Sequence, residues 1–115
     1  MRVLIVEDDG PLRERLARAL RDRGHSAGTA STGAAARTLA AQGFDGAIVD
    51  VRLGVESGLD VVADLLAVQP AARLIVVTGH LTPELSREAA RLGVTACLAK
   101  PFDADELLAA FDRAR

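Results

Sequence analysis

Short apolar segments alternate with segments of helical periodicity five times along this chain of 115 residues. The apolar segments are residues 2–6, 25–30, 44–50, 73–78 and 94–99. After the first of them, Leu12, Leu16 and Leu20 recur at helical spacing. Strands that alternate with helices pair in parallel through right-handed crossovers, and helices cover both faces of the resulting sheet. The sequence therefore predicts a doubly wound α/β fold, a (βα)5 three-layer sandwich, with residues 1–115 forming one domain.

Residues with strong positional preferences mark the ends of the predicted helices. Pro11 suits a first helical turn, and Gly24 ends that helix. Candidate caps precede three later helices: Thr32 before residues 33–42, Thr82 before residues 83–92, and Asp103 before the last helix. Residues 54–58 have the composition of a loop, because they include Gly54, Ser57 and Gly58. The run from Leu74 to Val77 is apolar throughout, which indicates a central strand of a parallel sheet.

The overall composition excludes several classes of function. The formal net charge is −2 and no long run has one sign, so we expect no direct contact with nucleic acid or membrane. Five arginines between residues 13 and 23 are interpreted as one solvated helix face. The absence of Tyr and Trp argues against aromatic stacking of a flavin or of bases. A single cysteine, Cys97, rules out an internal disulfide and favours a cytoplasmic location. The apolar start is too short for a signal peptide or a spanning helix.

An acidic residue, Asp50, ends the apolar run Ala47-Ile48-Val49. Burying an unpaired carboxylate is costly, so we expect Asp50 where the strand ends and the surface begins. Parallel sheets bind ligands beyond the carboxyl ends of their strands. The other strand ends supply further polar side chains at that edge: Glu7, Asp8 and Asp9 after the first strand, Thr78 after the fourth, and Lys100 after the fifth.

Several acids at one edge of the sheet need a compensating cation. Two like charges about 4 Å apart repel by roughly 4 kcal/mol at an effective dielectric constant near 20. Carboxylate oxygens with room for water suit Mg²⁺, which in turn attracts phosphate. Thr78 can donate a hydrogen bond to a phosphoryl oxygen, and Lys100 can pair with its charge. The residues therefore predict a phosphoryl-transfer site with a carboxylate as acceptor.

The motifs at these strand ends resemble those of the receiver domain of bacterial two-component response regulators, and of chemotaxis regulators in particular. The matching motifs are Val6-Glu7-Asp8, Ile48-Val49-Asp50, Val76-Val77-Thr78-Gly79 and Lys100-Pro101-Phe102. The resemblance extends over the full length. It implies a flavodoxin-like sheet with strand order 2-1-3-4-5, and a cis peptide bond between Lys100 and Pro101.

The resemblance also implies a role for each site residue. Asp50 would accept a phosphoryl group from a histidine kinase or a histidine phosphotransfer protein. Asp8 and Asp50 would bind Mg²⁺ directly, Arg52 would bind it through its backbone carbonyl, and Glu7 would act through water. Asp9, next to the acidic pair, would be a bystander.

Thr78 and Lys100 would sense the phosphoryl group in such a receiver. Phosphorylation adds about 1.5 to 2 negative charges, which would shift the population between two states of the face formed by the fourth helix, fifth strand and fifth helix. The output would be altered binding of a downstream effector protein or a fused output domain. The chain would then not be an enzyme beyond its own phosphorylation and dephosphorylation.

Three positions depart from the usual receiver pattern. Cys97 stands where an aromatic residue usually moves inward with the threonine, so that part of the switch is altered. Gly54 replaces a usual proline, which predicts a more mobile loop. Arg52 and His80 follow the phosphoacceptor and the threonine by two residues, and we expect them to tune the lifetime of the phosphoryl group.

Three alternatives remain open from the sequence. A Mg²⁺-dependent aspartyl-phosphate phosphohydrolase or mutase would also use an aspartate nucleophile, but it usually has a second acid where Arg52 stands. A nucleotide- or flavin-binding domain would carry a glycine-rich loop after the first strand, where this chain has acids. A pseudo-receiver would bind partners without being phosphorylated, although the full set of site residues argues against it.

Overall fold

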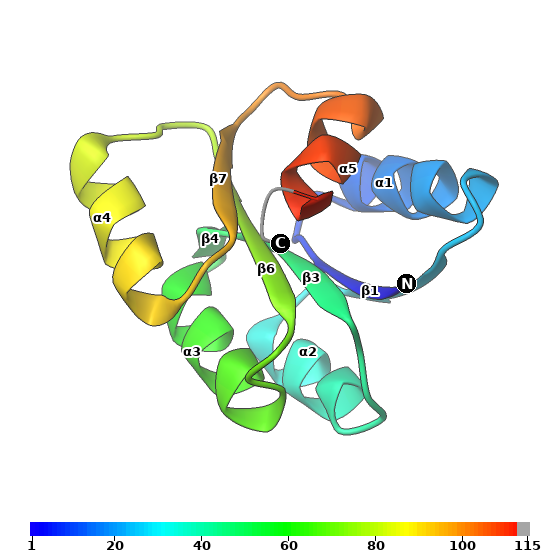
Figure 1. Ribbon diagram of the computed structural model, residues 1–115, viewed down its shortest axis with the longest axis horizontal. Helices are drawn as coiled ribbons and strands as arrows, with labels where there is room; N and C mark the ends of the chain where they lie inside the picture. The colour runs from blue at the N-terminus through cyan, green and yellow to red at the C-terminus, as the bar shows by residue number, and fades with distance from the viewer. Residues whose placement is uncertain (113–115) are drawn as a thin grey trace.

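The computed structural model describes residues 1–112 and contains a parallel sheet of five strands. Across the sheet the strands follow the order β2 (Ser26–Ala30), β1 (Arg2–Val6), β3 (Gly46–Asp50), β6 (Arg73–Thr78) and β7 (Ala96–Ala99) (Figure 1). This is the order 2-1-3-4-5 among the five strands that alternate with helices, so the predicted topology is confirmed. Leu74 to Val77 of β6 are buried, as expected for a strand with neighbours on both sides.

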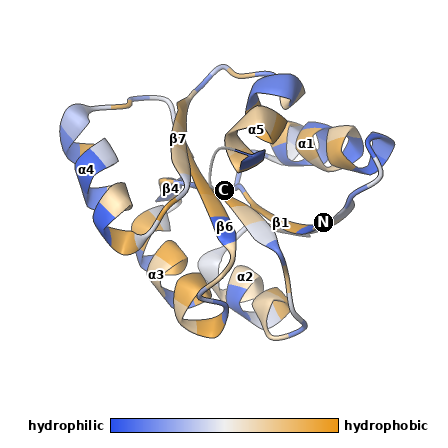
Figure 2. Ribbon diagram, in the orientation of Figure 1, coloured by the Kyte–Doolittle hydropathy of each residue, from blue (hydrophilic) through white to orange (hydrophobic). Residues whose placement is uncertain are grey.

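The helices form two layers, one on each face of the sheet. The helices α1 (Gly10–Asp22) and α5 (Ala104–Asp112) lie on one face. The other face carries α2 (Gly33–Ala40), α3 (Gly58–Val68) and α4 (Pro83–Leu92) (Figure 1). Each layer encloses its own hydrophobic core, and the colouring in Figure 2 shows apolar residues gathered along the strands between them. The predicted three-layer sandwich is therefore the observed architecture.

Side-chain caps begin the helices where the sequence indicates them. The hydroxyl oxygens of Thr32 and Thr82 accept hydrogen bonds from backbone N–H groups in the first turns of α2 and α4. The carboxylate of Asp103 accepts from the N–H of Glu106 at 2.8 Å. Asp9 caps α1 by accepting from the N–H of Leu12 at 3.1 Å. Asp9 thus has a structural role that the sequence analysis did not assign to it.

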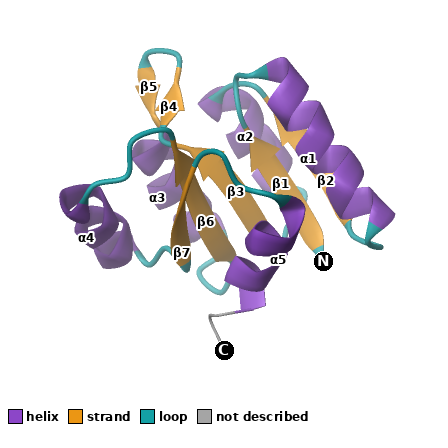
Figure 3. Ribbon diagram, turned by 90° about the horizontal axis from the view of Figure 1, so that it is seen from above, coloured by secondary structure: helices purple, strands orange, loops and turns teal. Residues whose placement is uncertain are grey.

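Residues 52–57 form a small hairpin where the sequence predicts a loop. The strands β4 (Arg52–Leu53) and β5 (Glu56–Ser57) pair in antiparallel fashion, and Figure 3 shows the hairpin projecting beyond the sheet. Gly54 adopts a φ of +61° in the turn, a conformation that glycine tolerates at little cost. Strands of two residues are too short to show a periodic pattern, so the sequence indicates a loop here but not the paired strands on either side of its turn.

Three predicted boundaries differ from the observed ones by two residues. The helix expected over residues 33–42 ends at Ala40, β3 begins at Gly46 rather than residue 44, and β7 begins at Ala96 rather than residue 94. Phe44 is buried in the core although it precedes its strand, so its hydrophobicity reflects packing and not strand pairing. Within residues 1–112, no helix has both the length and the apolar character that crossing a bilayer requires.

Candidate functional site

The carboxyl ends of four strands bring the predicted site residues together. Glu7 follows β1, Asp50 ends β3, Thr78 ends β6 and Lys100 follows β7. Glu7 is 2% exposed, and Asp50 and Thr78 are each 6% exposed. These three are therefore buried polar residues at the edge of an otherwise apolar sheet.

Asp50 lies deeper than the sequence analysis expects. It is still paired within the sheet opposite Val77, and it is buried, not at the beginning of the surface. The start of α3 packs directly against it, because a Cβ atom on Gly58 would overlap the backbone carbonyl of Asp50. Glycine at position 58 permits this close approach, and the N–H of Gly58 donates to the carbonyl of Val51 at 2.6 Å.

The ammonium group of Lys100 bridges the two buried carboxylates. Its Nζ atom lies 2.7 Å from Oδ2 of Asp50 and 2.8 Å from Oε1 of Glu7. Lys100 is the only lysine of the chain. The sequence predicts that Lys100 pairs with a phosphoryl group. Without phosphate, its ammonium group instead compensates the charge of the acids.

Backbone amides hold one carboxylate oxygen of Asp50 and one of Asp8. The N–H of Arg52 donates to Oδ1 of Asp50 at 2.9 Å, and the N–H of Gly54 donates to Oδ2 of Asp8 at 3.2 Å. Both donors belong to the β4–β5 hairpin or its turn. The hairpin therefore orients two of the candidate metal ligands, a function that the sequence analysis missed because backbone donors leave no mark in residue type.

Burial and pairing shift the pKa values of all three linked groups. Burial, together with the neighbouring Asp50, raises the pKa of Glu7 to about 7, although Lys100 opposes the shift. Burial would raise the pKa of Asp50, but its hydrogen bonds, chiefly with Glu7 and Lys100, outweigh this and lower it. Burial would lower the pKa of Lys100, but its bonds to both acids raise it. These opposite shifts favour the ionised form of Asp50 over that of Glu7.

The acidic residues form a donor set that fits Mg²⁺. Glu7, Asp8 and Asp50 each offer a carboxylate oxygen, and these three oxygens lie within 4.8 Å of one another. Hard oxygen donors of this number leave positions for water, as Mg²⁺ requires. Arg52 lines the same cavity, and its contribution through the backbone carbonyl stays a prediction.

An open cavity of about 490 Å³ lies above these residues. Its lining is Asp8, Asp50, Val51, Arg52, Thr78, Gly79, His80, Leu85 and Lys100. The hydroxyl oxygen of Thr78 accepts a hydrogen bond from the N–H of His80 at 3.1 Å, which leaves the hydroxyl proton free to be donated. The cavity therefore brings a hydroxyl, an ammonium and the acids around one space where a phosphoryl group fits.

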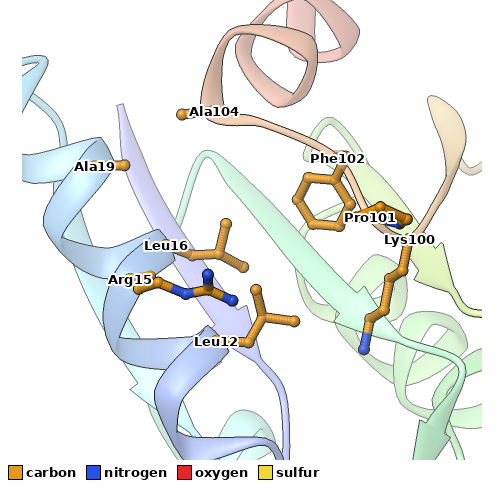
Figure 4. Close-up of a pocket in the computed structure, with 8 residues that line it drawn as sticks. All are labelled: Leu12, Arg15, Leu16, Ala19, Lys100, Pro101, Phe102 and Ala104. Carbon is orange, nitrogen blue, oxygen red and sulfur yellow. The ribbon is translucent and has the colours of Figure 1, made fainter.

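A second cavity, of about 460 Å³, lies between α1 and the segment that joins β7 to α5 (Figure 4). Leu12 and Leu16 of α1 face Phe102 across it, and Lys100 lines it as well. Lys100 therefore borders both cavities. This second cavity is not predictable from the sequence, since its walls come from segments near opposite ends of the chain.

Cys97 lies in β7 next to Val76 and is half-buried against the core beneath α2, α3 and α4. Burial raises the pKa of its thiol, which disfavours the reactive thiolate. This agrees with the interpretation of Cys97 as a small hydrophobic residue.

Comparison with known proteins adds independent information. The family model of the response regulator receiver domain matches residues 3–112. The photosynthetic apparatus regulatory protein RegA of Rhodovulum sulfidophilum is 41% identical over 94% of this chain and 60% of RegA. The alginate biosynthesis transcriptional regulatory protein AlgB of Pseudomonas putida is 36% identical over 92% of this chain and 24% of AlgB. The chain thus spans less than two thirds of either relative.

Solved structures show the same fold. A response regulator from Burkholderia pseudomallei, crystallised with a phosphorylated aspartic acid, a calcium ion and citrate, has a TM-score of 0.92 and 35% identity. That match covers 96% of this chain and 65% of the other. The chemotaxis protein CheY4 of Vibrio cholerae has a TM-score of 0.91 and 29% identity, over 99% of this chain and 98% of CheY4.

Proposed function

This chain belongs to the response regulator receiver domain family of two-component systems, and from that premise we propose that Asp50 is its phosphoacceptor. The observation that carries the proposal is the bridge from Lys100 to Asp50 and Glu7, at 2.7 and 2.8 Å. It favours an ionised carboxylate on Asp50, which lines the same cavity as Thr78. We further propose that residues 1–115 are one receiver domain.

The acidic residues would hold Mg²⁺, with Asp8 and Asp50 as direct ligands, the backbone carbonyl of Arg52 as a third, and Glu7 acting through water. When bound, Mg²⁺ supplies positive charge that offsets the repulsion between an acidic site and an incoming phosphoryl group. Asp8 and Asp50 would thus both repel an incoming phosphoryl group and bind the metal ion that offsets this repulsion.

In the transfer, a carboxylate oxygen of Asp50 attacks the phosphorus of a phosphohistidine. An oxygen–phosphorus bond forms, the phosphorus–nitrogen bond breaks, and the imidazole nitrogen keeps the electron pair. Lys100 then pairs with a phosphoryl oxygen, and the hydroxyl of Thr78 donates to another. The carboxylate and the phosphoryl group would thus compete for one ammonium.

The partners follow from this chemistry and from the relatives. A histidine kinase or histidine phosphotransfer protein supplies the phosphoryl group, and a downstream effector or a fused output domain receives the signal. AlgB is named a transcriptional regulatory protein, and the chain covers 24% of it, which supports an output function outside the matched region. We place these reactions in the cytoplasm, and the chain catalyses only its own phosphorylation and dephosphorylation.

The test is to incubate the chain with Mg²⁺ and acetyl phosphate and to determine its mass. We expect a gain of one phosphate that is lost in Asp50→Asn and when EDTA removes the metal. Asp22→Asn is the matched control, because Asp22 is an exposed aspartate at the end of α1. It should gain phosphate as the wild type does.

Two outcomes would contradict the proposal and favour an alternative. No gain of mass in the wild type would indicate a pseudo-receiver that only binds partners. Turnover of many equivalents of a phosphate ester would indicate a phosphohydrolase.

A further inference from the structure

The β4–β5 hairpin reaches the candidate metal site through two backbone amides. The N–H groups of Arg52 and Gly54 donate to Asp50 and Asp8, at 2.9 and 3.2 Å. A displacement of the hairpin would therefore also displace the carboxylates of Asp50 and Asp8, which the proposed function assigns to Mg²⁺.

The hairpin has little structure of its own to keep it in place. Its two strands contribute two residues each, and isolated hairpins of this size are marginal in water. Leu53 is its buried side chain, whereas Val55 at the tip is fully exposed. Figure 3 shows the hairpin standing beyond the sheet. Its position must therefore be stabilised from outside.

Arg37 in α2 supplies that contact. Its Nη2 atom lies 2.7 Å from Oε2 of Glu56 in β5, and its Nε atom lies 2.7 Å from Oδ2 of Asp64 in α3. One guanidinium thus connects the hairpin with two helices. A planar guanidinium held by a first carboxylate is already oriented for a second, so little further entropy is lost.

The backbone of α2 makes room for the same carboxylate. A Cβ atom on Gly33, the first residue of α2, would overlap the carboxylate of Glu56. Glu56 therefore lies across the N-terminus of α2, where the helix dipole favours negative charge. Glu56 of the hairpin therefore contacts α2 in two ways: its carboxylate fits against Gly33, which has no side chain, and it pairs with the charge of Arg37.

We propose that Arg37 is a positioning residue for the Mg²⁺ site. By holding Glu56, it fixes the hairpin whose amides orient Asp50 and Asp8. Arg37 does not line the cavity above Asp50, so its influence passes through the hairpin. The inference rests on the proposed function, because the acids are taken to bind Mg²⁺.

The test compares variants of the two carboxylates that share Arg37. NMR titration with MgCl₂ gives the dissociation constant, and hydrogen exchange of the Arg52 and Gly54 amides without metal gives the stability of the hairpin. Removing a residue that hydrogen-bonds to a metal ligand weakens metal binding by about tenfold or more. Because Arg37 and Glu56 act through the hairpin, we expect a smaller effect: the dissociation constant for Mg²⁺ should rise about three- to tenfold in Glu56→Gln and in Arg37→Met. Exchange at both amides should accelerate.

Asp64→Asn is the matched control, because it removes the ion pair between Arg37 and Asp64 of α3 and leaves the ion pair with Glu56 of the hairpin. We expect its Mg²⁺ affinity and amide exchange to stay close to those of the wild type. Arg87→Ala removes an ion pair within α4 and should change neither measurement.

Unchanged affinity and exchange in Arg37→Met and Glu56→Gln would overturn the role of Arg37. Equal losses in Asp64→Asn and Glu56→Gln would also overturn it, since the packing of α2 on α3 would then be responsible. Failure of the wild type itself to bind Mg²⁺ would instead contradict the proposed function, and this inference with it.

Discussion

Glu7 is a buried acid that shares one ammonium with a second acid. Its pKa is raised to about 7, first by burial and then by the nearby Asp50. Without metal, the folded protein therefore binds a proton at Glu7 at pH values where an unfolded chain, with a pKa of 4.5, does not. The contribution of Glu7 to folding stability must then fall as the pH rises from about 4.5 to 7.

We predict that Glu7→Gln removes this loss of stability. In EDTA, the melting temperature of the wild type should fall between pH 4.5 and 7.5, and that of Glu7→Gln should change less. Glu88→Gln, at an exposed position of α4, is the control and should follow the wild type. Mg²⁺ should restore wild-type stability near pH 7.5, because metal binding requires the deprotonated carboxylate. Parallel pH profiles for Glu7→Gln and wild type would show that Glu7 does not carry the effect.

At the scale of elements, β3 and α3 are in close backbone contact near the site. A Cβ atom on Gly58 would overlap the carbonyl oxygen of Asp50, and that neighbour is backbone, which cannot rotate away. The first turn of α3 and the end of β3 thus depend on one glycine.

We predict that Gly58→Ala destabilises the fold by about 1–3 kcal/mol through forced backbone shifts, and that it slows phosphorylation by acetyl phosphate. Gly10→Ala is the matched control, because Gly10 also begins a helix after a capping residue and its Cβ would make only an ordinary contact. Urea denaturation measures the free energy of unfolding. Equal stability of Gly58→Ala and Gly10→Ala would contradict the predicted collision.

At the scale of the whole molecule, the layers differ in how firmly they are anchored. Five residues of α3 are buried, whereas Ala89 is the buried residue of α4. Leu85 of α4 lines the same cavity as Thr78. A helix with few buried contacts opens at low free energy, so α4 is the element that a change at Thr78 can move most easily.

We predict that phosphorylation changes amide exchange most in residues 79–92, and less in α2 and in α1. Hydrogen-exchange mass spectrometry with and without acetyl phosphate measures this in the presence of Mg²⁺. Asp50→Asn should show no change under the same conditions. If amide exchange instead changed most in α2, the prediction for α4 would be wrong, and the change would be attributed to the hairpin that contacts α2.

The sequence by itself determined the alternation of five strands and helices and the residue types at each strand end. Both are local properties: burial imposes a period on each segment, and Glu7, Asp50, Thr78 and Lys100 directly follow or end their strands. These features were enough to predict the sheet order, through the family resemblance, and the members of the candidate site.

Only the tertiary structure decided how those residues are connected. The bridge from Lys100 to Glu7 and the contact from Arg37 to Glu56 join residues 93 and 19 positions apart. The amides of Arg52 and Gly54 act on Asp50 and Asp8 through backbone atoms that every residue type shares. Such contacts depend on how the elements pack, as at Gly58, and no periodic pattern in the chain encodes them.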